Sequence, residues 1–393
     1  MATPTLSPNK QTLSAVAFDA RAVAFADIPR TTWDRLLART HSPTPFSRWT
    51  FHRAWWDAYG DTAHEQYLVC LPAGRGARVD WSTVRAIVPL MHRHEIEPDD
   101  AECRTSVRPH EPTGTRVPGE AKAVFFGASY HADYATVVSD PADLPAAAIA
   151  TATALARPPD PAHGSTDWDV VDLRRLRPTD PALTALESAL SAKTGWRVVR
   201  ELEDVCPVVT SPSGDWDEFL ATLDKKARHE IRRKLRRAHS ISPLTIEIQS
   251  PSTAAIDAFI ALHRMRFGDD GLFPNNPGGE RSRHFLHRLA ELERNESDGG
   301  QLHVALVRCG TRLIFAALAF DDGASVFLYN AGMDPSARDA SPGVSGTALY
   351  FQDRLAAGRR RFDYLRGNES YKYEWGAIDE PVERVLVTTE SCP

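Results

Sequence analysis

The 393-residue chain has little of what marks a secreted, disulfide-stabilised or membrane-spanning protein. Its five cysteines are scattered and form no CxxC pair, which argues against a disulfide framework or a zinc site and favours free thiols in a reducing cytoplasm. No apolar run approaches the roughly 20 residues that cross a bilayer. The first residues also lack a basic segment followed by an apolar one, the pattern of a signal peptide. We therefore expect a cytoplasmic protein without an integral membrane segment.

Several signatures of catalysis and nucleic-acid binding are missing as well. The sequence has no GxSxG, no HExxH and no histidine pair at the spacing of metal ligands, so hydrolase and metal chemistry lack support and no metal is expected. A formal net charge of −6 argues against a DNA-binding protein, although local basic patches stay open. With 42% hydrophobic and 25% charged residues, the composition is that of a globular protein.

The length and the order of the expected elements predict two domains. A chain of 393 residues exceeds the usual size of one domain. Helices alternate with strands along it, which indicates an architecture of the α/β class with a mixed sheet, also described as α+β. Residues 1–20 are polar and contain Pro, Ser and Thr, so they are expected to form a flexible tail. We place an N-terminal domain at residues 21–205 and a C-terminal domain at residues 206–393.

Hydrophobic patterning places the elements of the first domain. Helix 48–59 has a heavily aromatic side that is expected to pack on a sheet, and the charged, Pro-rich residues 95–120 are expected to form a loop. His131 and Asp133 lie in a turn and either face a site on the second domain or make loop hydrogen bonds. The strands are expected at 23–25, 66–71, 84–90, 124–127, 135–138, 168–173, 196–199 and 206–209, and the other helices at 32–38, 141–155 and 181–192.

The second domain opens with the most basic segment of the chain. A helix start at residues 215–220, with acids in its first turn, leads into residues 225–237, KKARHEIRRKLRR. Apolar positions at three- and four-residue steps give this helix a narrow buried stripe and a broad cationic surface. That surface is either a solvated face or a clamp for a polyanion, such as the phosphates of coenzyme A, a tRNA or a lipid-linked sugar pyrophosphate.

Three antiparallel strands follow the basic helix. Residues 303–308 and 313–320 form a hairpin that a further strand at 325–330 extends. Before them, strand 245–248 leads into helices 253–266 and 281–292. The long loop that joins the helices, residues 268–279, is a candidate lid on the acceptor side.

Residues 341–376 combine an anion loop with a strand that ends in ionisable residues. The small-residue turn SPGVSG, from Ser341 to Gly346, opens a helix expected at 347–357, and an apolar strand is expected at 362–365. Small residues before a helix present free backbone N–H groups at the positive end of the helix dipole, which suits a phosphate. The ionisable and aromatic residues that follow the strand then indicate a reaction site.

The segments LYNAGMDP, SPG and GRRRFDYLRGNESYKYEWGA together resemble the GNAT-type acyltransferases of the CelD/BcsL group, which are related to the FemAB aminoacyltransferases. The resemblance covers residues 206–380 closely and residues 28–150 more loosely. It implies tandem GNAT-like (FemAB-like) domains, in which strands 325–330 and 361–365 splay apart around the pantetheine arm of the donor. SPGVSG stands where such enzymes usually carry an acetyl-CoA fingerprint, which leaves an aminoacyl-tRNA donor open beside acyl-CoA.

Acyl transfer to an amine needs a base, a polarised carbonyl and help for the leaving group. Asp363 and Glu369 are the candidate bases, and Tyr371 or Tyr329 would protonate a leaving thiolate. Lys372 is similar in position to a lysine in the C-terminal segment of FemAB enzymes, and by that resemblance it would hold negative charge.

The donor is expected to contact two strands and the small-residue turn. Arg366 would hold a donor carboxylate or phosphate. The alternative is a structural network, in which Asp363 forms an ion pair with Arg366 and the aromatic residues pack on the sheet. The full set of candidate cofactor-binding residues is Tyr329, Asn330, Ser341, Gly343, Ser345, Gly346 and Arg366.

The sequence thus predicts an enzyme, a GNAT-family N-acyltransferase. It would move an acyl group, by expectation acetyl, from acyl-CoA to an amine or hydroxyl of a small molecule or a cell-envelope or exopolysaccharide precursor. One alternative is a FemAB-like aminoacyltransferase that uses aminoacyl-tRNA, which makes tRNA a partner. Another is a non-catalytic GNAT-fold protein that binds a polyanion or a protein partner through residues 225–237.

Overall fold

The computed structural model of the chain describes residues 17–74, 76, 78–93, 121–157 and 167–389. The loop expected at residues 95–120 lies outside the described residues. Of the expected tail, only residues 17–20 are described, and Phe18 already begins a strand. No helix within these ranges combines the length and the apolar character that crossing a bilayer requires.

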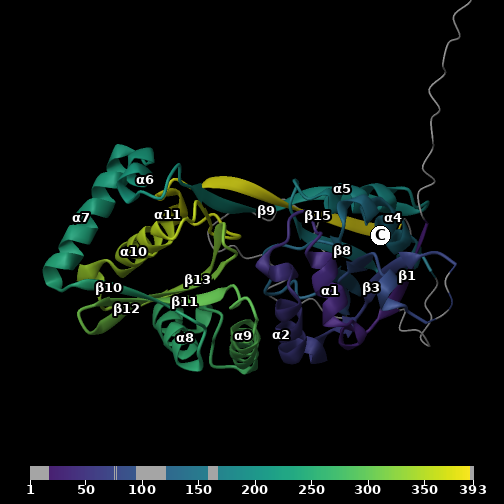
Figure 1. Cartoon of the computed structure of the whole chain (residues 1–393), viewed down its shortest axis with the longest axis horizontal. Coiled ribbons are helices and arrows are strands. Elements are labelled where there is room, and N and C mark those ends of the chain that lie inside the picture. The colour runs from purple at the N-terminus through teal and green to yellow at the C-terminus, as the bar shows by residue number, and fades with distance from the viewer. Residues whose placement is uncertain (1–16, 75, 77, 94–120, 158–166, 390–393) are drawn as a thin grey trace, which may run out of the picture.

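The described chain folds into two halves that share one large mixed sheet (Figure 1). Its 11 strands run in the order β10-β11-β12-β13-β14-β9-β15-β8-β6-β5-β2. A second, 4-stranded sheet with the order β1-β3-β4-β7 completes the first half. The expected mixed α/β architecture is confirmed.

The second half occupies the β10 end of the large sheet. Helices α8 and α9 cover one face of β10 to β13, and α10 covers the other (Figure 1). The elements are α6 (Trp216–Thr222), α7 (Lys225–Ile241), β10 (Leu244–Gln249), α8 (Thr253–Phe267), α9 (Pro277–Arg294), β11 (Leu302–Cys309), β12 (Arg312–Asp321), β13 (Ser325–Met333), α10 (Pro342–Ala356), β14 (Arg361–Asp363) and α11 (Ser370–Tyr373).

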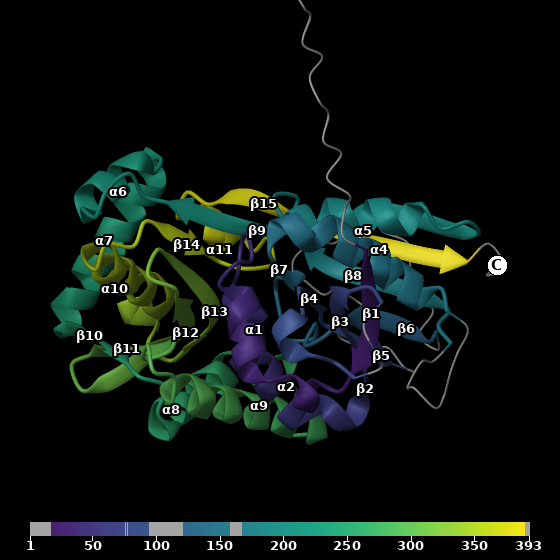
Figure 2. The same ribbon diagram turned by 45° about the vertical axis from the view of Figure 1, so that its right-hand side comes forward.

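The first half repeats this order of elements with less regular strands. Figure 2, turned from the first view, shows α4 and α5 along the upper side of this half, with α1 and α2 lower in the view. The elements are β1 (Phe18–Val23), α1 (Arg30–Leu37), α2 (Trp49–Tyr59), β2 (His64–Glu65), β3 (Tyr67–Pro72), β4 (Ala86–Val88), β5 (Leu90–Arg93), β6 (Ala123–Phe126), β7 (Val138–Ser139), α4 (Leu144–Leu155), β8 (Val170–Leu176) and α5 (Pro181–Ser191).

Two long strands join the halves. β9 (Trp196–Thr210) and β15 (Ile378–Thr389) pair antiparallel along the length of β15. On one side β9 pairs with β14 of the second half, and on the other side β15 pairs with β8 of the first half. The paired strands β9 and β15 therefore stand between the two halves and make their strands one continuous sheet.

The halves have equivalent topology, as expected for a tandem. Each begins with a strand, two helices and an antiparallel hairpin: β1-α1-α2-β3-β4 in the first half and β10-α8-α9-β11-β12 in the second. Each then has two parallel strands connected by a helix, β6-α4-β8 and β13-α10-β14. A helical crossover is the usual way to join parallel neighbouring strands.

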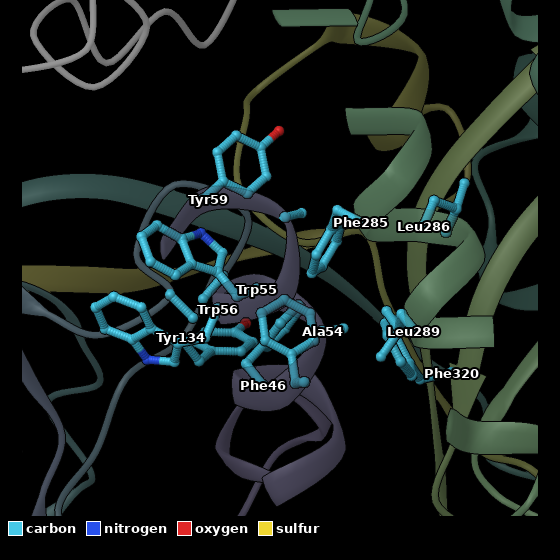
Figure 3. Close-up of a cluster of buried hydrophobic side chains, with 14 of the residues drawn as sticks. Phe46, Ala54, Trp55, Trp56, Tyr59, Tyr134, Phe285, Leu286, Leu289 and Phe320 are labelled. Atoms are coloured by element: carbon cyan, nitrogen blue, oxygen red, sulfur yellow. The ribbon is translucent and has the colours of Figure 1, made fainter. Parts of the chain in front are cut away.

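A dense aromatic interface packs α2 of the first half against α9 of the second. The ring centres of Phe51 and Tyr59 in α2 lie 5.4 and 6.4 Å from that of Phe285 in α9. Figure 3 shows Tyr59 and Phe285 within this cluster of buried side chains. The Tyr59 hydroxyl lies 3.0 Å from Ser282 Oγ. Farther along α9, the buried Glu293 carboxylate accepts a hydrogen bond from Arg48 Nε at 3.2 Å. The aromatic side of α2 thus packs on a helix of the other half as well as on its own sheet.

Several expected boundaries need correction. Residues 84–90 form two strands rather than one, because Pro89 has no N–H to donate and the chain crosses there from one sheet to the other. The segments 196–199 and 206–209 belong to one strand, β9. Residues 215–237 form two helices, since Asp224 caps a new helix through the N–H groups of Lys226 and Ala227. The strand β15 was not expected at all.

Candidate functional site

An opening between two parallel strands organises the site. β13 and β14 pair through only three residues, from Ser325↔Arg361 to Phe327↔Asp363. β14 ends there, whereas β13 continues to Met333 without it. The strands predicted to splay apart are therefore neighbours that diverge, as expected.

A β-bulge marks β13 at the point of divergence. The register between β12 and β13 shifts so that Leu328 and Asn330 face consecutive residues, which leaves Tyr329 as the extra residue. Bulges re-aim side chains and interrupt pairing, and they are common beside active sites. The Tyr329 hydroxyl donates to the carbonyl oxygen of His131 at 3.1 Å, and burial raises its pKa well above the usual value.

The SPGVSG segment is the first part of α10 rather than a loop that precedes it. Pro342 occupies the first helical turn, and Ser341 before it adopts a left-handed conformation, with φ of 48°. Ser345 is fully buried, and its hydroxyl donates to the carbonyl oxygen of Ser341 at 3.0 Å. A Cβ on Gly346 would overlap the ring of Phe315 in β12. Ser345 and Gly346 thus fix α10 to the sheet.

The amino end of α10 lies at the divergent end of β13. A Cβ on Gly343 would meet the Met333 side chain at the end of β13 at 3.1 Å. Ser341 and Gly343 are partly exposed there. The positive end of the α10 dipole therefore lies near the opening, which favours a phosphate group. Pro342 has no N–H, and the N–H groups of Val344 and Ser345 donate to the carbonyl oxygen of Ser341, so the dipole contributes more there than open N–H groups do.

The basic helix α7 packs beside this helix end. It contacts α10 and the turn Arg338–Ala340 that precedes it. Arg237 of α7 pairs with Asp339 in that turn. Ile231, Leu235 and Ala238 form the buried stripe, as predicted, and most of the cationic side chains are exposed. Positive charge is thus concentrated on the α10 side of the opening.

Asp363 ends β14 in a fully buried position. Its Oδ2 accepts a hydrogen bond from the Tyr134 hydroxyl at 2.8 Å, and its Oδ1 accepts one from the N–H of Leu365 at 2.8 Å. Its guanidinium partner is Arg361, with Nη2 at 3.2 Å, and not Arg366 as the structural alternative expected. Burial raises the pKa of the carboxyl, against the opposing effects of Arg361 and the hydrogen bonds.

A turn of the first half contacts three of the predicted site residues at once. Besides the bond from Tyr134 to Asp363, Asp133 Oδ1 accepts from Arg366 Nε at 2.6 Å. His131 Nδ1 lies 3.2 Å from the Tyr329 hydroxyl. The His131 and Asp133 pair thus faces the second half, which is the first of the two arrangements that the sequence left open.

Lys372 is buried and holds the chain that follows β14. Its ammonium group donates to the carbonyl oxygens of Arg366 at 3.0 Å and Gly367 at 2.8 Å, and it lies 2.8 Å from Glu369 Oε2. Tyr371 leaves 40% of its surface exposed, yet the protein around its phenol partly excludes water. This desolvation, together with the charge of Glu369, raises the pKa of Tyr371 to about 12. The phenol therefore stays protonated at neutral pH. The roles predicted for these residues in catalysis stay predictions.

A small cavity lies next to the bulge, on the face of the sheet that α8 and α9 cover. His131, Tyr329 and Asn330 line one side of it, and Phe273 in the α8–α9 connection lines another. Its volume of about 10 Å³ holds roughly one water molecule. The connection predicted as a lid is shorter than expected, since α9 begins at Pro277, and its role toward an acceptor stays a prediction.

Two ionisable residues near the opening were not singled out from the sequence. Asp204 lies in β9, beside the chain that follows β14, where the N–H of Gly367 donates to the carbonyl oxygen of Val205. Burial raises the pKa of Asp204 to about 6, opposed by the charge of Arg366 and reinforced by Glu203. Arg266 at the end of α8 is the other. The pKa values of Asp204 and Arg266 are shifted by burial under elements distant in sequence, so no local sequence pattern marks either residue.

Replacing Asp204 by asparagine is expected to change how stability depends on pH. With a folded-state pKa of about 6, above the ordinary 3.8, the folded protein binds more protons than the unfolded one between these values. Wild-type stability therefore falls as pH rises through this window, by about 1–3 kcal/mol. Denaturant unfolding at pH 4, 6 and 8 should show a flatter profile for Asp204→Asn, and identical profiles would contradict the assignment.

Residues 225–373 match the family model described as the acetyltransferase (GNAT) domain. The whole chain is similar in fold to the crystal structure of FemX, with a TM-score of 0.56 and 10% identity over 93% of this chain and 96% of that one. It is also similar to a conserved protein of unknown function from Bacteroides thetaiotaomicron, with a TM-score of 0.50 and 11% identity over 94% and 99% of the two chains. No curated protein matches the chain in sequence.

Residues 225–373 thus match a GNAT acetyltransferase domain, and the chain as a whole has a fold similar to that of FemX. The predicted mixed α/β fold and the predicted similarity to GNAT and FemAB-type proteins are confirmed, whereas membership of the CelD/BcsL group stays a prediction. A GNAT domain suggests an acyltransferase that uses acyl-CoA.

Proposed function

We propose that this protein is an acyltransferase of the CelD/BcsL type. It moves an acyl group, in the simplest case acetyl, from acyl-CoA to an amine or hydroxyl of a small molecule or a cell-envelope precursor. The observation that carries the proposal is the opening between β13 and β14, with the amino end of α10 and the basic helix α7 on one side of it. A thioester arm in the opening would place its phosphates at α10.

The proposed chemistry follows from this placement. The acceptor nitrogen or oxygen attacks the thioester carbonyl, the C–S bond breaks, and a proton passes from the acceptor to the leaving sulfur. Tyr371 keeps its proton at neutral pH, because its pKa is raised to about 12, and it can donate to the sulfur. Glu369 beside it is the proposed acceptor of the proton. Asp363 and Lys372 fix the intervening chain and act as positioning residues.

We also propose functional boundaries for the two halves. The donor is taken by residues 206–393, because in the first half the gap between β6 and β8 is closed by its own chain. Ala135 pairs there with Leu176, and its N–H donates to the carbonyl oxygen of Arg175. Residues 21–205 then supply the turn with His131, Asp133 and Tyr134 and contribute to the acceptor side.

A thermal-shift titration with acetyl-CoA tests the donor. Binding to the native state stabilises it by about 2.7 kcal/mol at a hundredfold excess over the dissociation constant, and the midpoint rises accordingly. Activity with acetyl-CoA should survive RNase. If acetyl-CoA at millimolar concentration causes no shift, and transfer from aminoacyl-tRNA is abolished by RNase and weakened by salt, the donor is an aminoacyl-tRNA.

A further inference from the structure

Arg266 lies beside the opening, at the end of α8. Its Nη1 lies 3.5 Å from the carbonyl oxygen of Ala331, in the part of β13 that has diverged from β14. Its guanidinium group lies 4.4 Å from the ring centre of Phe267. Tyr371 and Glu369 are close enough to act on its charge. The side chain is thus held between β13 and the segment that carries the proposed catalytic residues.

The positive charge of Arg266 is partly buried and has no carboxylate partner. Across residues 17–389, as far as they are described, no Asp or Glu oxygen lies within 4 Å of it. By contrast, Arg361 and Arg366 on the other side of the opening each have a carboxylate partner. Burial lowers the pKa of the Arg266 guanidinium, because its charged form loses contact with water. The nearby acidic groups do not compensate for this loss.

The two acidic groups that act on the charge of Arg266 do not neutralise it. Glu369 lies 2.8 Å from the Lys372 ammonium, which engages its charge. Tyr371 is a neutral phenol at ordinary pH. A guanidinium that is withdrawn from water without a counter-charge costs free energy, and an anion that arrives from solution recovers it through paired hydrogen bonds.

The face of the sheet on which Arg266 lies indicates whether the donor or the acceptor carries the anion. Side chains alternate across a strand, so Gly332 and Met333 face opposite sides of β13. A Cβ on Gly332 would overlap the backbone of α8, whereas Met333 contacts Gly343 of α10. Arg266 therefore lies on the face opposite the amino end of α10, where the phosphates of the donor are proposed to bind.

We propose that Arg266 binds a carboxylate or phosphate group of the acceptor. The acceptor would then be an amine or hydroxyl compound that carries a negative charge, such as an amino acid, a peptide with a free carboxylate or a sugar phosphate. Phe267 supplies an apolar surface behind the guanidinium, and the Ala331 carbonyl fixes its orientation. This inference rests on the proposed transferase function, since it takes the opposite face of the site as the donor side.

The test compares Arg266→Gln with Arg264→Gln in the full chain. Arg264 is two residues earlier on α8 and points about 200° away around the helix, which makes it a matched control. Thermal midpoints are measured with inorganic phosphate and with glutarate, at ionic strength held constant with sodium chloride. Both anions should raise the midpoint of the wild type and of Arg264→Gln. Glutarate should not raise that of Arg266→Gln, and phosphate should raise it less than in the wild type, because the phosphate site proposed at α10 is left intact. Without ligand, Arg266→Gln should be at least as stable as the wild type.

Each other result overturns the inference. It is wrong if neither anion shifts the wild type, if Arg266→Gln responds like the wild type, or if Arg266→Gln unfolds much more easily and so has a structural role. An acetyl-CoA titration separates the two proposals: Arg266→Gln should bind acetyl-CoA as the wild type does, and a loss of that binding would assign the anion to the donor. Failure of acetyl-CoA to bind the wild type removes the proposed donor and leaves the phosphate and glutarate results unchanged.

Discussion

Replacing Lys372 by alanine should destabilise the protein by about 3–5 kcal/mol and abolish acyl transfer. Lys372 is 3% exposed, and its ammonium group donates to the carbonyl oxygens of Arg366 and Gly367 and pairs with the Glu369 carboxylate. Its removal leaves buried acceptors and a carboxylate without a partner, and each such group costs about 1–3 kcal/mol or more. The segment between Asp363 and Tyr371 would then lose its fixed path beside the opening.

Guanidinium unfolding and an acetyl-transfer assay, run on the same preparation, measure both effects. Lys226→Ala is the control, because Lys226 is exposed on α7 and its side chain holds no part of this segment. Its unfolding midpoint should match that of the wild type. If Lys372→Ala lost activity while its midpoint stayed at the wild-type value, Lys372 would belong to the chemistry and not to the support of the site.

Gly346→Val should be the most disruptive single change in α10. Even the Cβ of alanine would overlap the ring of Phe315, and that ring is buried between the helix and β12. Overpacking of this kind costs about 1–3 kcal/mol, and a branched side chain adds to it. The helix can relieve the overlap only by moving off the sheet, which carries its amino end away from the opening. We therefore expect weaker acetyl-CoA binding together with a lower thermal midpoint.

Gly343→Ala is the matched control on the same helix. Its Cβ would meet the flexible end of Met333 at 3.1 Å, so a small rotation of that side chain makes room. Stability should change by less than about 1 kcal/mol, and acetyl-CoA binding should persist. Equal losses in the two variants would show that this helix end tolerates no side chain of any kind, and the packing argument for Gly346 would be wrong.

Local patterns were enough to predict most of the second half. The short apolar runs of β11, β12 and β13 and the periodic stripe of α7 can be recognised in the sequence, because each pattern lies within a single element. The strand β15 was missed because its residues carry Pro381 and several charges, and its partners are distant in sequence. Its pairing with β8 and β9 outweighs this weak local preference.

The site was predictable as a region but not as a set of contacts. SPGVSG has the composition of a turn, yet Pro at the first helical position and a glycine that packs on Phe315 are also typical of a helix start against a sheet. The partners of Asp363 and Arg366 include Tyr134 and Asp133, which are more than 200 residues away. The unusual environments of Asp204 and Arg266 arise from burial by several elements, which no short pattern encodes.

The exchange of β9 and β15 between the halves also sets the order in which the protein can be completed on the ribosome. β8 has β15 as a neighbour in the finished sheet, and about 200 residues separate the two strands. At about 5–20 residues per second, synthesis leaves that edge of β8 without its partner for roughly 10–40 s. An unpaired strand edge invites pairing with other chains. The nascent first half should therefore depend on chaperone protection until the last strand emerges, and neither half should fold when expressed alone.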